Sequence, residues 1–165
     1  MDIILNSEGA PLYTQEDFQK NRAQLRRRLT WIMIPAAVLL GLVVWSFILR
    51  VKWLTMALSV VLGSGLIFAY GMFLSPIIAY GRHLQQALTG RTRSLAGAFK
   101  EMEESAVARE GVMYYPMLVS VGDMAEPEDD RLFYYDANIS RPSFQVGERL
   151  TITAHDKFVT AWSRV

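Results

Sequence analysis

The sequence contains no cysteine, and this absence excludes several kinds of protein. Disulfide scaffolds, cysteine-ligated zinc sites, iron–sulfur clusters and thiol nucleophiles all require a sulfur that the chain lacks. Histidine is scarce as well, because the chain has only His83 and His155, and a metal site needs three or four converging ligands. The sequence has no phosphate-binding loop, dinucleotide fingerprint, nucleophile elbow or paired-histidine zinc motif. We therefore expect a non-enzymatic protein without a cofactor or a resident metal.

Acidic residues are missing from residues 18–100, although that segment holds 11 Lys or Arg. Residues 1–17 hold four acids and no base, and residues 101–165 hold 12 acids and six bases. The formal net charge of +1 therefore conceals a strong segregation of charge along the chain. A soluble globular domain carries both signs on its surface, so this pattern is typical of a membrane-inserted segment with basic flanks.

Two apolar runs, residues 29–49 and residues 53–81, contain no charged residue. A helix rises about 1.5 Å per residue, so about 20 residues cross the hydrocarbon layer of a bilayer. Neither run shows the polar stripe of an amphipathic helix, although two buried helices of a soluble bundle are the alternative. We predict two transmembrane helices over these runs, joined by a tight turn at residues 50–52.

The cations beside the two runs predict the orientation, because Lys and Arg are retained on the cytoplasmic side of a membrane. Five cations precede the first run, four follow the second, and the turn holds only Arg50 and Lys52. Both termini are therefore expected in the cytoplasm. Basic side chains at the membrane surface also attract anionic lipids. The predicted contacts with anionic headgroups are Lys20, Arg22, Arg26, Arg27, Arg28, Arg82, Arg91 and Arg93.

The segments around the two runs complete the predicted fold. Residues 1–13 are expected to form a flexible or docked arm, and residues 14–28 a basic amphipathic helix that begins at Thr14 and enters the membrane. Residues 82–110 have helical spacing and predict a membrane-proximal connector helix. From residue 111 to 165 the period changes to two, with a hairpin turn near Asp156 and Lys157. The expected fold is a membrane protein of the α+β class, whose small cytoplasmic antiparallel β-domain is an OB-like or SH3-like partly open barrel.

Small residues recur at four-residue spacing in both apolar runs. Small side chains let helix backbones approach closely in lipid, so we expect these positions to form helix–helix interfaces. One stripe would suffice to pack a hairpin, and the second run has two, which favours additional contacts with other chains. The predicted interface residues are Ala37, Gly41, Ser59, Gly63, Gly65, Ala69, Gly71, Ser75 and Ala79.

An acidic cluster lies between two predicted strands, and it comprises Glu126, Glu128, Asp129 and Asp130. Carboxylates attract Ca²⁺ and Mg²⁺, but the cluster lacks the ligand spacing and the turn glycine of an EF-hand loop. We interpret it as a solvated loop that can face a partner.

These features together predict a non-enzymatic integral membrane protein with two spans. In this hypothesis the chain is an accessory or scaffold subunit that assembles with itself or with a larger membrane complex. Its expected partners are membrane lipids, anionic ones above all, and other membrane chains, but no nucleic acid. The alternative is a homo-oligomeric channel lined by the second helix, which would lack the ring of charges found in many ion-selective pores.

Overall fold

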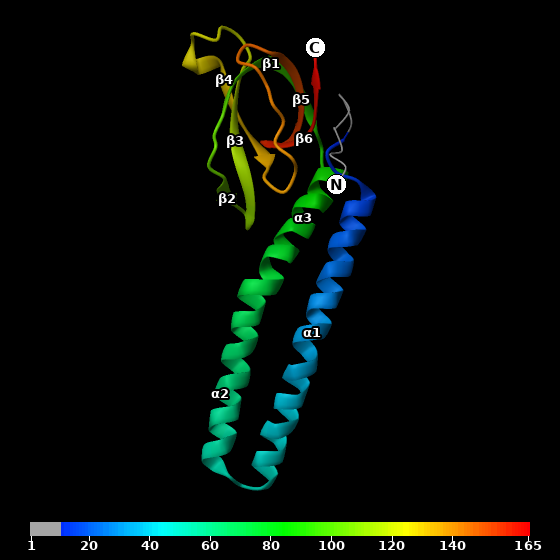
Figure 1. Ribbon diagram of the computed structural model, residues 1–165, viewed down its shortest axis with the longest axis vertical. Helices are drawn as coiled ribbons and strands as arrows, with labels where there is room; N and C mark the ends of the chain where they lie inside the picture. The colour runs from blue at the N-terminus through cyan, green and yellow to red at the C-terminus, as the bar shows by residue number, and fades with distance from the viewer. Residues whose placement is uncertain (1–10) are drawn as a thin grey trace. The chain divides into compact units, whose positions relative to one another are not determined.

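The computed structural model of the chain describes residues 11–165, which form an α+β fold of two long apolar helices and a six-stranded mixed sheet (Figure 1). The described residues divide into two compact units. The helical unit comprises residues 19–81, and the β unit comprises residues 11–18 together with residues 82–165. The predicted α+β class is confirmed, whereas residues 1–10 of the predicted arm lie outside the described residues.

Helix α1 (Gln15–Ile48) begins at a capping box. The Thr14 hydroxyl accepts a hydrogen bond from the Asp17 amide at 3.2 Å, and the Thr14 amide donates to the Asp17 carboxylate at 2.9 Å. The two groups satisfy amide donors that have no partner inside the helix. The helix start expected at Thr14 is therefore confirmed.

The second long helix runs from Lys52 to Thr89 and contains a wider turn near its middle. It consists of α2 (Lys52–Ala69), the π-helical turn η1 (Tyr70–Leu74) and α3 (Ser75–Thr89). Pro76 has no amide proton and its ring crowds the preceding turn of a helix. The π-helical turn lies directly before it, where the Ser75 amide bonds the carbonyl of Tyr70. This bond spans five residues, so the wider turn makes room for the proline without ending the helix.

Both long helices are long and apolar enough to cross a membrane. Their most apolar 18-residue windows have mean hydropathies of 2.3 and 2.0, and only 6% of each window is buried. A core helix of a soluble protein would instead be mostly buried. In Figure 1 the first helix (blue to cyan) and α2 (cyan to green) lie side by side as an antiparallel hairpin.

The connector helix predicted over residues 82–110 is wrong beyond Thr89. Helix α3 ends there, and the chain enters strands β1 (Arg93–Met102) and β2 (Val107–Arg109). Gly90, just after α3, and Gly97, within β1, mark this change. A Cβ on Gly90 would lie 2.5 Å from the His155 ring, and one on Gly97 would lie 2.5 Å from the Ser120 carbonyl oxygen. These close approaches are made by residues distant in sequence, so helical spacing alone could not indicate them.

The sheet therefore begins at Arg93 and not at residue 111. Its remaining strands are β3 (Val112–Ser120), β4 (Asp130–Asp136), β5 (Arg149–His155) and β6 (Phe158–Arg164), with the short helix η2 (Pro127–Asp129) before β4. The strand order is β1-β5-β6-β4-β3-β2, and an added β1–β3 pairing joins five of the strands into a ring.

The expectation of an all-antiparallel sheet is also wrong. Strands β4 and β6 are parallel, and they pair only at Tyr134 and Phe158. The physical reason is the long connection over residues 137–148, which returns the chain to pair with β1 before β6 reaches β4. The ring is thus least tightly closed between these two strands.

The core of the β unit fills the inside of this ring. The predicted β5–β6 hairpin is confirmed, with Asp156 in the left-handed region at φ 53°. Leu150, Ile152 and Ala154 share its buried face, as the alternation predicts. The core residues are Phe99, Met117, Val119, Phe133, Tyr135, Leu150, Ile152, Ala154 and Val159.

Candidate functional site

A buried polar network joins three distant segments of the β unit. The side chains are Tyr13, just before α1, His83 in α3 and Asp136 at the end of β4, and each is less than a tenth exposed. The Tyr13 hydroxyl donates to Asp136 Oδ2 at 3.2 Å and lies 2.8 Å from His83 Nε2. Because the carboxylate can only accept, the tyrosine oxygen accepts from Nε2–H, which assigns the tautomer of His83.

The other end of the network is also satisfied. Asp136 Oδ1 accepts hydrogen bonds from the backbone amide and the side-chain amide of Asn138, at 2.8 and 2.9 Å. The His83 ring is packed edge-on against the rings of Tyr13, Tyr114 and Phe158. A buried carboxylate is costly unless it is hydrogen bonded, so these partners are needed for Asp136 to be accommodated inside the unit.

The segment before α1 is attached to the sheet by backbone contacts as well. Leu12 donates its amide to the Thr160 carbonyl at 2.8 Å, and Pro11 forms an isolated bridge with Ala161 of β6. Strand β6 pairs with β4 only at Phe158, and the segment before α1 contacts the part of β6 that follows, at Thr160 and Ala161. The described part of the predicted arm is therefore docked on the β unit.

Burial controls the ionisation of the network. Burial lowers the pKa of His83, and this effect exceeds the opposite influence of Asp136 and Glu110. Burial also raises the pKa of Tyr114, and it raises the pKa of Tyr135 to about 12. Burial therefore favours the neutral imidazole of His83 and the neutral phenols of Tyr114 and Tyr135. The hydrogen bonds of the network join the segment before α1 to α3 and to β4.

Sequence reasoning missed this network. It considered His83 only as a possible metal ligand and attached no role to Tyr13 or Asp136. Tyr13 and Asp136 are 123 residues apart, and His83 is 70 residues from Tyr13, so no local spacing connects them. The other histidine, His155, ends β5 beside the hairpin turn and donates from Nδ1 to the Arg91 carbonyl at 2.9 Å.

Within the helical unit, the less exposed residues of α1 and α2 recur at three- and four-residue spacing, and we call them the seam of the hairpin. They are Leu25, Ile32, Ala36, Leu39, Val43 and Ser46 in α1, and Leu54, Thr55, Leu58, Leu62 and Ala69 in α2. The Ser46 and Thr55 hydroxyls are hydrogen bonded at 2.8 Å near the turn, and Asn21 donates to the Ile77 carbonyl at 3.2 Å toward the other end.

Most of the predicted small-residue interface is not part of this seam. A Cβ built on Gly41, Gly63, Gly65 or Gly71 would meet nothing within 4 Å. Ala37 and Ser59 are exposed, whereas Ala69, Ser75 and Ala79 are half-buried. Only Ala69 lies in the seam, so the four glycines do not serve the packing of the hairpin.

The predicted headgroup contacts are all exposed. Five of them lie in the first half of α1, and Arg82 lies in α3, Arg91 in the following loop and Arg93 at the start of β1. The guanidinium of Arg28 also lies 5.8 Å from the centre of the Phe73 ring, on the second long helix. The cations near the start of the first long helix thus belong to the helical unit, and those near the end of the second long helix belong to the β unit.

The acidic cluster is only partly available to a partner. Asp130 forms a salt bridge with Lys100 at 2.7 Å, and Asp129 accepts a hydrogen bond from the Asp123 amide at 2.9 Å. Glu126 and Glu128 are exposed. Within residues 11–165 no group of three or more His, Asp or Glu side chains could hold a metal ion.

Comparison of the chain with protein-family models, with curated proteins and with solved structures finds no match. The function must therefore be argued from the geometry of the two units.

Proposed function

We propose that this chain is a membrane-anchored accessory or scaffold subunit without catalytic activity. In this proposal the hairpin crosses the bilayer twice and the β unit lies in the cytoplasm with both termini. The hairpin packs against another membrane helix, contributed by a second copy or by a larger membrane protein, and the β unit is displayed as an OB-like barrel. The five-stranded ring with a single parallel pair at its weakest junction supports that type of barrel.

The observation that carries the proposal is the open space beside the glycines of the hairpin. Helices in lipid gain packing energy where small residues let backbones approach, but among residues 11–165 a Cβ on Gly63, Gly65 or Gly71 would meet nothing within 4 Å. The hairpin instead uses its seam of larger side chains. The two small-residue stripes of the second helix are therefore left for helices from outside the chain.

Purification of the full chain in mild detergent, followed by crosslinking and mass spectrometry, tests this proposal. Gly63→Leu and Gly71→Leu should reduce the crosslinked assembly while membrane insertion stays intact. Val61→Leu is the matched control, since Val61 is exposed on the same helix and already carries a branched side chain. Unchanged assembly in both glycine variants contradicts the proposal. A fixed homo-oligomer that also conducts current in planar bilayers would favour the channel instead.

Orientation has a separate test, which the absence of cysteine makes simple. Single cysteines are introduced at Asp156 in the β unit and at Lys52 in the hairpin turn, and intact cells are treated with a membrane-impermeant maleimide. We expect labelling of Lys52→Cys alone. Labelling of Asp156→Cys from outside contradicts the cytoplasmic placement of the β unit.

A further inference from the structure

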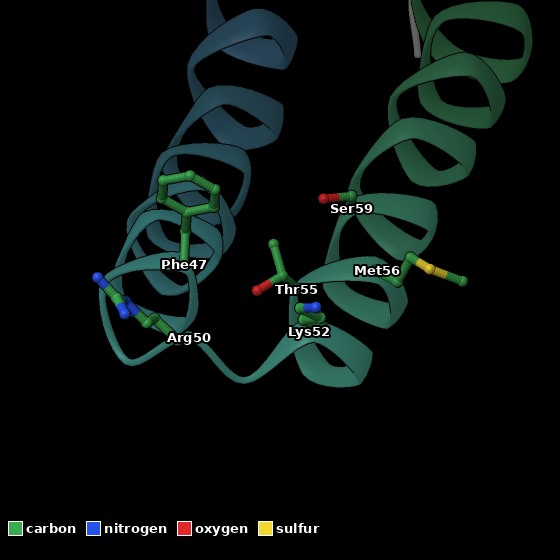
Figure 2. A pocket seen from close by; sticks show the side chains of 6 residues that line it. All are labelled: Phe47, Arg50, Lys52, Thr55, Met56 and Ser59. Atoms are coloured by element: carbon green, nitrogen blue, oxygen red, sulfur yellow. The ribbon is translucent and has the colours of Figure 1, made fainter.

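A cavity of about 670 Å³ opens between α1 and α2 next to their turn (Figure 2). Its lining combines two apolar side chains, two cations and two hydroxyls: Phe47, Met56, Arg50, Lys52, Thr55 and Ser59. In Figure 2, Thr55 and Ser59 point from α2 toward α1. The volume lies within the range of sites that hold small molecules, and the lining is suited to an amphiphilic ligand.

The charge of the cavity selects a negative ligand. Arg50 and Lys52 stand at its turn end, and residues 18–100 contain no acid that could neutralise them. Both side chains are exposed. A guanidinium binds a phosphate through two parallel hydrogen bonds, and an ammonium attracts it as a point charge, so each of these two lining cations suits a phosphate group. In Figure 2 the Arg50 side chain extends from the end of α1 and the Lys52 side chain lies at the start of α2.

The backbone of Arg50 gives a second, independent indication. Arg50 has φ 55°, in the left-handed region that favours glycine. The Val51 amide bonds the Ser46 carbonyl and the Arg50 amide bonds the Phe47 carbonyl, which makes Arg50 the residue that follows the helix in a Schellman motif. Glycine occupies this place in most such motifs. Arginine at this place carries a conformational cost that glycine would avoid, as Glu110 and Asp156 also do elsewhere in the chain, and a use for the side chain would account for it at the turn.

The level at which the cavity would lie in a bilayer indicates a lipid as the source of the phosphate. Trp45 and Trp53 flank the turn and are 63% and 73% exposed. Exposed tryptophans gather at the headgroup level of a bilayer, so the cavity lies at that level in the proposed membrane placement, on which this inference rests. We propose that the turn cavity binds one anionic phospholipid, with its headgroup at the end of the cavity that carries Arg50 and Lys52 and its chains beside Phe47.

Native mass spectrometry of the full chain in mild detergent tests this site. The chain is titrated with phosphatidylglycerol or with phosphatidylcholine of the same acyl chains, and the bound lipid is counted. We expect one tight phosphatidylglycerol per chain and about tenfold weaker binding of phosphatidylcholine, because charged hydrogen bonds are lost. Arg50→Gly and Lys52→Gln should each weaken the tight binding by about tenfold for the same reason.

The variants separate binding from folding. Arg50→Gly relieves the positive φ, so its thermal unfolding midpoint should not fall. Arg149→Gln removes the same charge from an exposed position at the start of β5 and should bind the lipid normally. Unchanged binding in Arg50→Gly or in Lys52→Gln overturns the proposal. An equal loss in Arg27→Gln also overturns it, because the basic face of α1 would then hold the lipid.

Three outcomes distinguish a wrong ligand, a wrong membrane placement and a wrong lipid site. Displacement of the lipid by millimolar inorganic phosphate at constant ionic strength would reveal a free-phosphate site and overturn the lipid assignment. A chain that stays folded and dissolved without detergent contradicts the membrane placement itself. If the chain needs detergent but Arg50→Gly binds phosphatidylglycerol normally, the membrane placement stands and only the proposed lipid site is contradicted.

Discussion

The two units of this chain place their apolar side chains in opposite directions. In the helical unit, Phe47 and Ile67 are 73% and 76% exposed. In the β unit, Leu150 and Ile152 are completely buried. Burial of apolar surface away from water is the main favourable contribution to folding, so the β unit has a core that water would stabilise. The helical unit has its apolar surface outside and is suited to surroundings that are themselves apolar.

The largest expected difference between the two units is in the loss of unfolding free energy when an isoleucine in each is replaced by alanine. Ile152→Ala leaves a cavity in a packed core and should lower the free energy of unfolding of the β unit by about 2–5 kcal/mol. Ile67→Ala removes a side chain that already faces outward and should change the stability of the chain by less than about 0.5 kcal/mol. Pulse proteolysis of the full chain in detergent measures both. Similar losses in the two variants would contradict the comparison.

Buried polar groups give a second test of the difference between the two units, because the β unit contains the buried carboxylate of Asp136. Tyr13→Phe removes the hydroxyl between Asp136 and His83 and leaves buried polar atoms without that partner. It should lower the free energy of unfolding of the β unit by about 1–3 kcal/mol and expose residues 11–14 to protease. Tyr115→Phe is the control, since Tyr115 is half-buried and packs against Arg141 through its ring. Equal losses would mean that the hydroxyl network has no special weight.

Acidification should destabilise the β unit through His83. Its pKa is lowered in the folded state, so the unfolded state binds more protons, and stability falls as the pH drops below the unfolded value of 6.5. The groups that influence the ring are Asp136, Glu110 and His155, and Tyr13 is its hydrogen-bond partner. One proton changes the free energy by at most about 1.4 kcal/mol per pH unit.

Denaturant unfolding between pH 7.5 and pH 5.5 measures this dependence. His83→Gln should flatten it, because glutamine does not titrate, while His155→Gln should retain it. A slope that persists in His83→Gln would assign the dependence to another group.

The sequence predicted the helical unit better than the β unit, and the reason is physical. An apolar run and its flanking cations are local signals, so the two long helices could be recognised without knowledge of their neighbours. Strand β1 is recognisable only through its partners. Gly97 reads as a weak helix residue until the Ser120 carbonyl is seen to lie against it.

Within the candidate site, the residue types were informative but their partners were not. The four-residue spacing drew attention to Gly63 and Gly71, whereas the less exposed residues of the hairpin include Leu39 and Leu62. Four-residue spacing of small side chains indicates a surface suited to close approach, and it does not say which helix approaches. The Tyr13–His83–Asp136 network lay outside prediction because its hydrogen bonds connect distant segments of the chain.

The smallest expected effect concerns the polar pair within the helical unit. Ser46 and Thr55 share a hydrogen bond at 2.8 Å in the seam, and double-mutant cycles on such bonds between membrane helices give about 0.6 kcal/mol on average. A cycle of Ser46→Ala and Thr55→Val, measured by thermal unfolding in detergent, should return a coupling energy of that size. It should be smaller than the loss in Tyr13→Phe, because hydroxyls of separated membrane helices find other hydrogen-bond partners, whereas Tyr13→Phe leaves buried polar groups without one. A coupling energy of 2 kcal/mol or more, about the largest seen for membrane helices, would show that the turn is held as tightly as the network of the β unit and would remove the contrast between the two units.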